Sequence, residues 1–193
     1  MLLPVIGVLA IIIIYVFLTY NKFVTTKTRI KASIQEVGNQ LKRQVDLIPN
    51  LVSSVKGYMK HEQKIFKDLT DARKMVAGAV ESGSAQKMID VSARLERALG
   101  PIRAVFESTP QLQAAGPTSK LMDELRDTAD KIMYSRRTLI DLSADYNIMV
   151  VTIPSNFVAS IFGFKEEPGI KIPETGEALE VKTEETLTPK VEL

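Results

Sequence analysis

The residues of this chain that come nearest to a catalytic motif are His61 and Glu62. A zinc-protease helix needs a second histidine four residues after the first, and Ile65 occupies that place. The 193 residues include one histidine and no cysteine. This composition excludes a disulfide scaffold, a thiolate zinc site and a thiol nucleophile, and no base is paired with a serine. We therefore predict no catalytic, cofactor or metal site, and we expect a protein that is not an enzyme.

Carboxylates offer a second route to chemistry, a di-metal site inside a helical bundle. Such sites need four or more inward-facing acids together with Glu-x-x-His pairs, and one histidine cannot supply them. The acids between residues 121 and 153 mostly fall outside the apolar positions of that segment, which predicts a solvated face. These acids are Asp123, Glu124, Asp127, Asp130, Asp141 and Asp145.

The block around Pro49 has the most unusual local chemistry. A proline inside a helix removes one donor and leaves the carbonyl four residues earlier, that of Val45, without its partner. Asn50 or a polar side chain of a facing helix could satisfy this carbonyl, and Asp46 could pair with Arg43 one turn away. We treat Asp46, Pro49 and Asn50 as a candidate kink that shapes the bundle, with a groove for a partner as the alternative.

Basic residues concentrate just after the first twenty residues. Residues 22–60 include eight basic and two acidic side chains, residues 61–164 are balanced, and residues 165–193 have four lysines against eight glutamates. A basic segment beside a membrane attracts anionic headgroups, whereas nucleic-acid binding would need interleaved aromatic residues or a known motif. The candidate lipid-facing residues are Lys22, Lys27, Arg29, Lys31, Lys42 and Arg43. A solvated face is the alternative for Lys42 and Arg43.

The apolar run at the N-terminus predicts a membrane anchor. Residues 2–20 carry no charge, and 19 residues at ~1.5 Å each come close to spanning a ~30 Å hydrocarbon core. A cleaved signal peptide would need a basic start and a small-residue cleavage site, and this run has neither. Because basic residues collect on the cytoplasmic side of an anchor, we predict an anchor over residues 1–21 with the N-terminus outside and the following domain in the cytoplasm.

After the anchor, apolar residues recur at alternating steps of three and four, which is the pattern of amphipathic helices. One series covers residues 30–80 and crosses Pro49 without losing its phase, so we predict a single kinked helix there. A turn at residues 81–84 separates it from a second helix with apolar positions over residues 88–105. Residues 100–101, Gly-Pro, are expected to bend this second helix.

The remaining segments predict one more long helix and a short one. Residues 108–119 hold two prolines and one glycine and predict a loop. The third helix covers residues 121–153 and is stopped by Pro154. A short amphipathic piece over residues 155–162 follows, and Gly163 is suited to end it.

Apolar seams of this kind must be buried, so the helices must pack on one another. The sequence therefore predicts an all-α protein, with an N-terminal transmembrane helix followed by an antiparallel long-helix bundle of three to four helices over residues 22–164. Two seam positions of the third helix, Thr128 and Ser135, are small enough to let a neighbouring helix approach closely. Residues 165–193, rich in Glu, Thr and Pro, predict a disordered acidic tail.

Several segments of the chain resemble the LemA family. The longest covers residues 40–62 and reads QLKRQVDLIPNLVSSVKGYMKHE. Tyr-Asn at residues 20–21, DYN at 145–147 and PSNFVASIFGFK at 154–165 follow the same family pattern. In order, these segments cover about residues 15–165. The resemblance implies a bacterial-type membrane protein with one N-terminal anchor, an antiparallel α-helical domain and no established enzymatic activity.

The chain departs from the family pattern at several positions. Ile34 and Val37–Gly38 stand where the family usually has a tryptophan and an Ile-Asp pair, and Gln44 replaces the second arginine of the following run. Thr109 and Ala129 replace an aromatic and an acidic residue. Surface recognition typical of mainstream members is therefore not carried over to this chain, whereas the core seams are kept.

The resemblance also bears on function, since some specialised members are tied to intracellular membrane organelles such as magnetosomes. Others tend to be encoded beside a membrane metalloprotease. We expect a single-pass protein of the plasma (inner) membrane, or of an intracellular membrane derived from it, that presents its bundle as an interaction scaffold. The alternatives are an anionic-lipid-binding or membrane-remodelling module, in which the basic segment and the short amphipathic piece over residues 155–162 both engage headgroups, and a regulator of a membrane protease. The expected partners are membrane lipids and a protein of unknown identity, not nucleic acid, and association into a homo-oligomer stays open.

Overall fold

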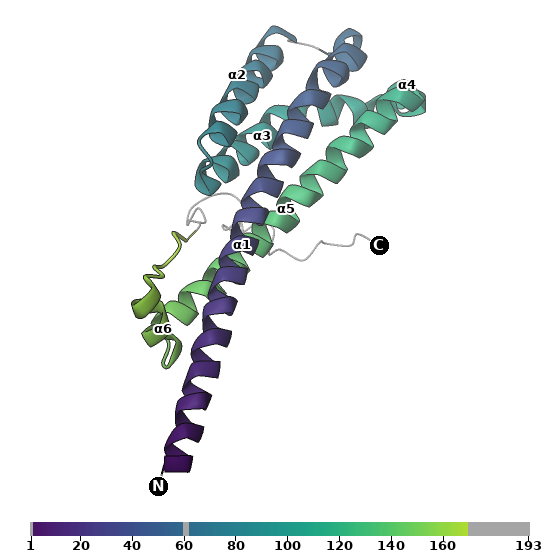
Figure 1. Cartoon of the computed structure of the whole chain (residues 1–193). Coiled ribbons are helices and arrows are strands. Elements are labelled where there is room, and N and C mark those ends of the chain that lie inside the picture. Colours follow the sequence, from purple (N-terminus) through teal and green to yellow (C-terminus); the bar gives the residue numbers. More distant parts are fainter. Residues whose placement is uncertain (1, 60–61, 170–193) are drawn as a thin grey trace, which may run out of the picture.

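The computed structural model describes residues 2–59 and 62–169 of the chain (Figure 1). Within these two ranges the chain forms helices and no strand, which confirms the all-α prediction. The helices are α1 (Leu2–Val55), α2 (Glu62–Glu81), α3 (Ala85–Ser108), α4 (Pro110–Ala114), α5 (Gly116–Val151) and α6 (Ser155–Phe162), and a 3-10 turn, η1 (Lys56–Tyr58), follows α1. The predicted disordered tail lies outside the described residues apart from 165–169.

Helix α1 is the axis of the fold. It runs without a break from the apolar N-terminal segment into the bundle, where α5 lies along it and the α2–α3 hairpin packs beside it (Figure 1). Of the described residues, only those of α1 form a helix long and apolar enough to cross a membrane, and its most apolar window is 6% buried. A core helix would be mostly buried, so this end of α1 is exposed as a membrane span would be. The predicted boundary between the anchor (1–21) and the bundle (22–164) therefore falls inside one helix.

The apolar series over residues 30–80 is divided between two helices. The prediction that the helix continues past Pro49 is confirmed, because α1 extends to Val55. The prediction that it continues to residue 80 is wrong. Helix α1 ends at Val55, η1 follows it, and Met59 is extended with φ −96° and ψ 137°. Gly57 weakens the helix at this point. Reversal of the chain also lets the apolar face of α2 pack back on α1 and α3, whereas a straight helix would leave that face in solvent.

The predicted loop over residues 108–119 is also wrong. The segment forms the short helix α4 and the first turn of α5, and each begins with a proline in its first turn. A proline there loses no helical hydrogen bond and has the φ angle that a helix needs. The predicted turn at residues 81–84 is confirmed, with Gly83 at φ +64° and the Ser84 hydroxyl accepting a hydrogen bond from the Lys87 amide at 3.4 Å.

The long helices bury a common core built from their seam positions. Its fully buried members include Leu41 of α1, Leu95 of α3 and Leu125 of α5. The small residues Thr128 and Ser135 are buried as well, on the helix that packs most extensively against α1, as their size predicts. A separate apolar cluster lies nearer the N-terminal end of α1 and joins it to α5 and α6.

Gly38 allows a direct test of this packing. A Cβ at Gly38 would already be in van der Waals contact with the Met88 sulfur, at 3.5 Å, and with a Val80 methyl carbon, at 3.6 Å, so a larger side chain would crowd both residues. We expect Gly38→Leu to lower the free energy of unfolding by about 1–3 kcal/mol through overpacking. Gly78→Leu is the matched control, because a Cβ at Gly78 meets nothing within 4 Å. Denaturant unfolding followed by circular dichroism checks the difference, and equal stabilities would contradict this packing.

Candidate functional site

The structure places the predicted Pro49 site on the outer side of α1. Asp46, Pro49 and Asn50 are all exposed, while the seam positions beside them face the core. The Asn50 carbonyl accepts a hydrogen bond from the Ser54 hydroxyl at 2.9 Å, so helical order persists after the proline. The three residues thus share one solvent-facing surface far along α1 from the apolar run. That this surface is a groove for a partner stays a prediction.

The predicted lipid-facing residues lie at different heights along α1. Lys22, Arg29 and Lys31 are exposed and lie within about 17 Å of Tyr20 along the helix, at about 1.5 Å per residue. Their position agrees with a basic flank beside the end of the apolar run.

Lys42 and Arg43 lie in a different environment. They follow Tyr20 by about 33 Å along the same helix, which is several Debye lengths of about 8 Å. The Arg43 guanidinium forms an ion pair with Glu124 of α5, with Nη2 and Oε2 3.6 Å apart. This distance and this ion pair favour the alternative, a solvated face of the bundle for Lys42 and Arg43, and contact of these two residues with lipid stays a prediction.

Aromatic side chains from α1, α5, α6 and the segment after α6 contact one another in a cluster, which we call the juxtamembrane cluster. Its members are Tyr20 and Phe23 of α1, Tyr146 of α5, Phe162 of α6 and Phe164. Phe23 is fully buried and stacks on Phe164 with ring centroids 4.7 Å apart, and the Tyr146 ring meets it edge-on at 5.6 Å. Tyr20 packs on Phe162 at 4.8 Å. Aromatic pairs of this kind contribute about 0.5–1.5 kcal/mol beyond the burial of their area, so the cluster holds α6 firmly on α1.

Local sequence explains why the chain returns to α1 at this point. Pro154 follows α5, and the predicted short helix forms as α6. Gly163 has the left-handed conformation, with φ +72°, and the Phe164 amide donates to the Ala159 carbonyl at 2.9 Å. Glycine adopts this conformation without the strain that a Cβ would cause. The resulting turn directs Phe164 back onto Phe23, which confirms the predicted end of the helix.

A polar contact, the Glu167 clamp, closes the cluster on one side. The side-chain amide of Asn147 donates to the Glu167 carbonyl at 3.0 Å and accepts from the Glu167 amide at 2.9 Å. The Glu167 carboxylate pairs with Lys27 at 3.0 Å, and the Lys27 ammonium lies 5.8 Å from the centre of the Tyr146 ring. Lys27, predicted to face lipid, is thus paired with Glu167 while 40% of its side chain stays exposed. Glu167, predicted to belong to a disordered tail, is an ordered part of the fold.

Two pKa shifts follow from this geometry. The hydrogen bond to Glu167 raises the pKa of Lys27 above its ordinary 10.5, and burial raises the pKa of Tyr146 above its ordinary 10.0. For both groups the folded state favours the protonated form. The resulting stability is complete at pH values below the unfolded-state pKa and is lost as the pH rises through the raised folded-state pKa. The Lys27 ammonium of the clamp is accordingly charged throughout the physiological range.

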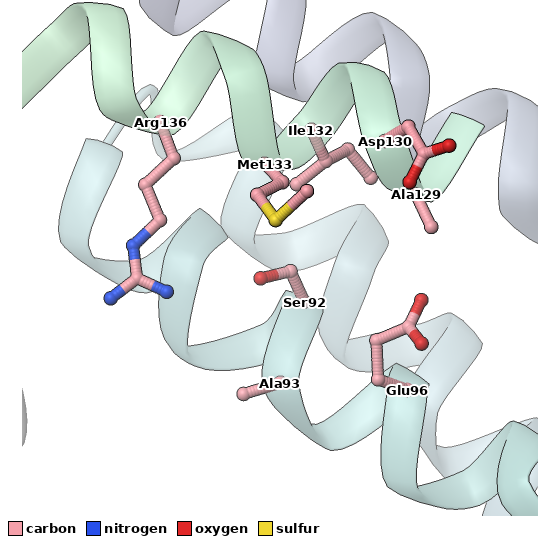
Figure 2. A pocket seen from close by; sticks show the side chains of 8 residues that line it. All are labelled: Ser92, Ala93, Glu96, Ala129, Asp130, Ile132, Met133 and Arg136. Atoms are coloured by element: carbon pink, nitrogen blue, oxygen red, sulfur yellow. The ribbon is translucent and has the colours of Figure 1, made fainter. Parts of the chain in front are cut away.

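A second candidate site is the cleft of about 290 Å³ between α3 and α5 (Figure 2). Met133 and Arg136 of α5 face Ser92 and Glu96 of α3 across it. The Glu96 carboxylate is already engaged, by Arg103 at 2.8 Å and, more weakly, by the buried Gln44 side chain at 3.4 Å. The cleft therefore offers a mixed apolar and charged surface for contact with another molecule.

The described residues offer no assembled metal site. No group of three or more His, Cys, Asp or Glu side chains is placed to hold an ion within residues 2–59 and 62–169, and His61 lies outside these ranges. The six acids predicted to form a solvated face of α5 are all exposed, as expected. Two of them, Asp123 and Asp127, form ion pairs with basic residues one turn away on the same helix.

Sequence reasoning missed the juxtamembrane cluster and the Glu167 clamp. The DYN and PSNFVASIFGFK segments were prominent only as a family pattern, and Glu167 was assigned to the tail. One signal was present: residues 146–164 lack any charged side chain, as do residues 2–21, and these are the two longest such stretches of the chain. Two uncharged stretches of this length favour contact with each other or with the same apolar medium.

The Glu167 clamp is testable through Asn147. We expect Asn147→Ala to remove two part-buried hydrogen bonds, to speed amide hydrogen exchange over residues 164–169 and to lower the free energy of unfolding by about 1–2 kcal/mol. Asn39→Ala, at an exposed position of α1, is the matched control. If Asn147→Ala exchanges over residues 164–169 at the same rate as the wild type and the control, the clamp does not hold this segment.

Known proteins are similar to this chain over most of its length. The chain is similar to the magnetosome protein MamQ of Magnetospirillum gryphiswaldense, with 25% identity over 169 residues, 76% of this chain and 62% of that protein. It is also similar to magnetosome proteins MamQ 1 and MamQ 2 of Paramagnetospirillum magneticum, each 27% identical over 190 residues, 84% of this chain and 69% of the relative. The chain thus spans less than two thirds of the first relative. The LemA family profile matches residues 33–184, most of the chain and all of the bundle segments that carried the resemblance, and the protein belongs to the LemA family.

Proposed function

We propose that this protein is a single-pass membrane protein whose helical bundle acts as a non-enzymatic interaction scaffold at the membrane surface. The observation that carries the proposal is the continuity of α1, since the apolar run and the axis of the bundle are one helix of 54 residues. A bundle attached in this way is held at a set height and orientation, whereas a flexible linker would let it move freely. A fixed platform suits the assembly of other components beside a membrane.

The named relatives support a role in a membrane compartment. They are magnetosome proteins, and the present chain shares 25–27% identity with them over most of its length. We extend this likeness to the proposal that the protein helps to organise an intracellular or plasma-membrane compartment of a bacterium. The exposed basic residues after the apolar run support an orientation with the N-terminus outside and the bundle in the cytoplasm.

Binding of anionic lipid is a second candidate function. It is favoured by the exposure of Lys22, Arg29 and Lys31 beyond the apolar run. A basic residue close to the membrane surface, as Lys22 would be, can gain about 1 kcal/mol of attraction to anionic headgroups, and the gain falls off within a Debye length. The scaffold and the lipid-binding functions differ in what the outer surface of the bundle contacts, and that difference can be measured.

Photo-crosslinking in the native membrane tests the scaffold. We expect benzoylphenylalanine at Met133, in the α3–α5 cleft, or at Asn50, on the exposed side of α1, to capture a specific protein from the full-length chain in its own membrane. The same probe at Phe17, 64% exposed in the apolar run, is the control and should capture lipid. If the probes at Met133 and Asn50 both capture no protein, the scaffold is contradicted and lipid binding is favoured.

The proposed orientation can be tested without background labelling, because the chain has no cysteine. Ser53 is exposed on the bundle part of α1, so Ser53→Cys provides one reactive thiol at a known place. We expect a membrane-impermeant maleimide to label it only after the cells are permeabilised. Labelling of intact cells would place the bundle outside and reverse the proposed orientation.

A further inference from the structure

Large apolar side chains are exposed at the corner where α5 ends and α6 begins. They contribute six positions with 48–73% of their surface exposed, which are Ile148, Val151, Ile153, Phe157, Ile161 and Phe162. No charged residue interrupts this corner, since residues 146–164 are uncharged. An exposed apolar patch of this kind, rimmed by polar residues, marks a surface that contacts something apolar.

The corner lies beside the end of the apolar run of α1 (Figure 1). Phe162 of α6 packs on Tyr20, and Val16 packs against the apolar cluster that includes Val158 and Ala159 of α6. Thr19 is the only buried residue between residues 3 and 20, which shows that the corner covers one side of this segment. If residues 2–20 fill the hydrocarbon core, α6 lies at the depth of the boundary between acyl chains and headgroups.

Three backbone carbonyls at the corner, those of Ile148, Met149 and Thr152, have partners within the protein, as an apolar medium favours. The Ser155 hydroxyl lies 2.7 Å from the Met149 carbonyl and 2.9 Å from the Thr152 carbonyl, within hydrogen-bond reach of both. The Ile148 carbonyl accepts from both the amide and the hydroxyl of Thr152. The interruption between the two helices therefore leaves these carbonyls paired without help from water.

Charged residues bound the uncharged corner on both sides, with Asp145 before it and Lys165 and Glu166 after it, and all three are exposed. Lys22 follows the apolar run of α1, and Lys165 follows the uncharged stretch of the corner, and both side chains are exposed. Lys22 and Lys165 are the sequence neighbours of Phe23 and Phe164, whose rings stack on each other. The two lysines can face anionic headgroups, and the charges on both sides of the stretch mark where the apolar surface of the corner ends.

We propose that the α5–α6 corner is a second membrane-binding element, which inserts its exposed apolar side chains into the leaflet from which α1 emerges. Its occupant is the bilayer that α1 crosses. The short amphipathic helix α6 lies in the interface while α1 crosses it, and the juxtamembrane cluster joins the two. This inference rests on the proposed function in one respect, that α1 spans the membrane.

The absence of tryptophan from the chain makes a single-probe test clean. Full-length Phe157→Trp and Ile161→Trp, at positions 62% and 73% exposed, are reconstituted into vesicles of phosphatidylcholine brominated on its acyl chains. Tyr134→Trp is the matched control. This position is 72% exposed and lies about 18 Å before Tyr146 along α5. Phe17→Trp, within the apolar run, reports the anchor. Circular dichroism confirms that each variant keeps its helices.

We expect bromine to quench the two corner probes at least about twofold more than Tyr134→Trp, with emission shifted to shorter wavelength. Corner probes quenched no more than Tyr134→Trp, while Phe17→Trp is quenched, would overturn the inference and leave the proposed function standing. Blue-shifted corner emission without quenching would show that a second copy of the chain covers the corner, which also overturns it. If Phe17→Trp is not quenched, the anchor and the proposed function fail with it.

Discussion

The burial of one long apolar face, that of α1, is the constraint on which the rest of the structure depends. This helix is apolar around its N-terminal end and apolar on one side thereafter, and no break separates the two regimes. The bundle part of the face can be buried only by helices that lie along it, which α5 and the α2–α3 hairpin do. The order of the fold, with a central first helix and later helices returning to it, follows from that requirement.

The juxtamembrane cluster lies where α1 changes from a helix that is apolar on all sides to one that is apolar on a single side. Where the apolar run ends, α1 still exposes large side chains, and a bundle beginning higher up would leave them uncovered. Phe23 is instead buried by Tyr146 and Phe164, which are brought to it by the end of α5 and by the turn after α6. The Glu167 clamp then closes the polar side of the same contact. The DYN and PSNFVASIFGFK segments thus act together at one place, although they lie far from α1 in the sequence.

The two ends of the molecule have different surfaces, and this division agrees with a scaffold. The α5–α6 corner near the apolar run is uncharged and has exposed aromatic residues, with a basic flank beside it on α1, whereas the bundle carries the mixed surface of the α3–α5 cleft and the exposed acids of α5. Gln44 extends the polar character into the core, where it is fully buried beside Glu96 and keeps one oxygen without a partner among the described residues. A shorter side chain in place of the family's arginine explains this weak contact with Glu96, because it brings no charge and fewer donors.

Sequence by itself determined the helical class, the apolar run, the turn at residues 81–84 and the seam of α5, because periodicity and turn chemistry are local properties. It did not determine where the series over residues 30–80 is divided, since Pro49 and Gly57 are both local reasons to end a helix. The packing of α2 against α1 and α3 selected Gly57. Tertiary structure also decided that Lys27 and Glu167 pair with each other. They are 140 residues apart in the sequence, and their charges alone predicted contact with solvent or lipid. Their pairing depends on the return of α5 and α6 to α1, and a contact between such distant segments is set by the burial of shared apolar surface.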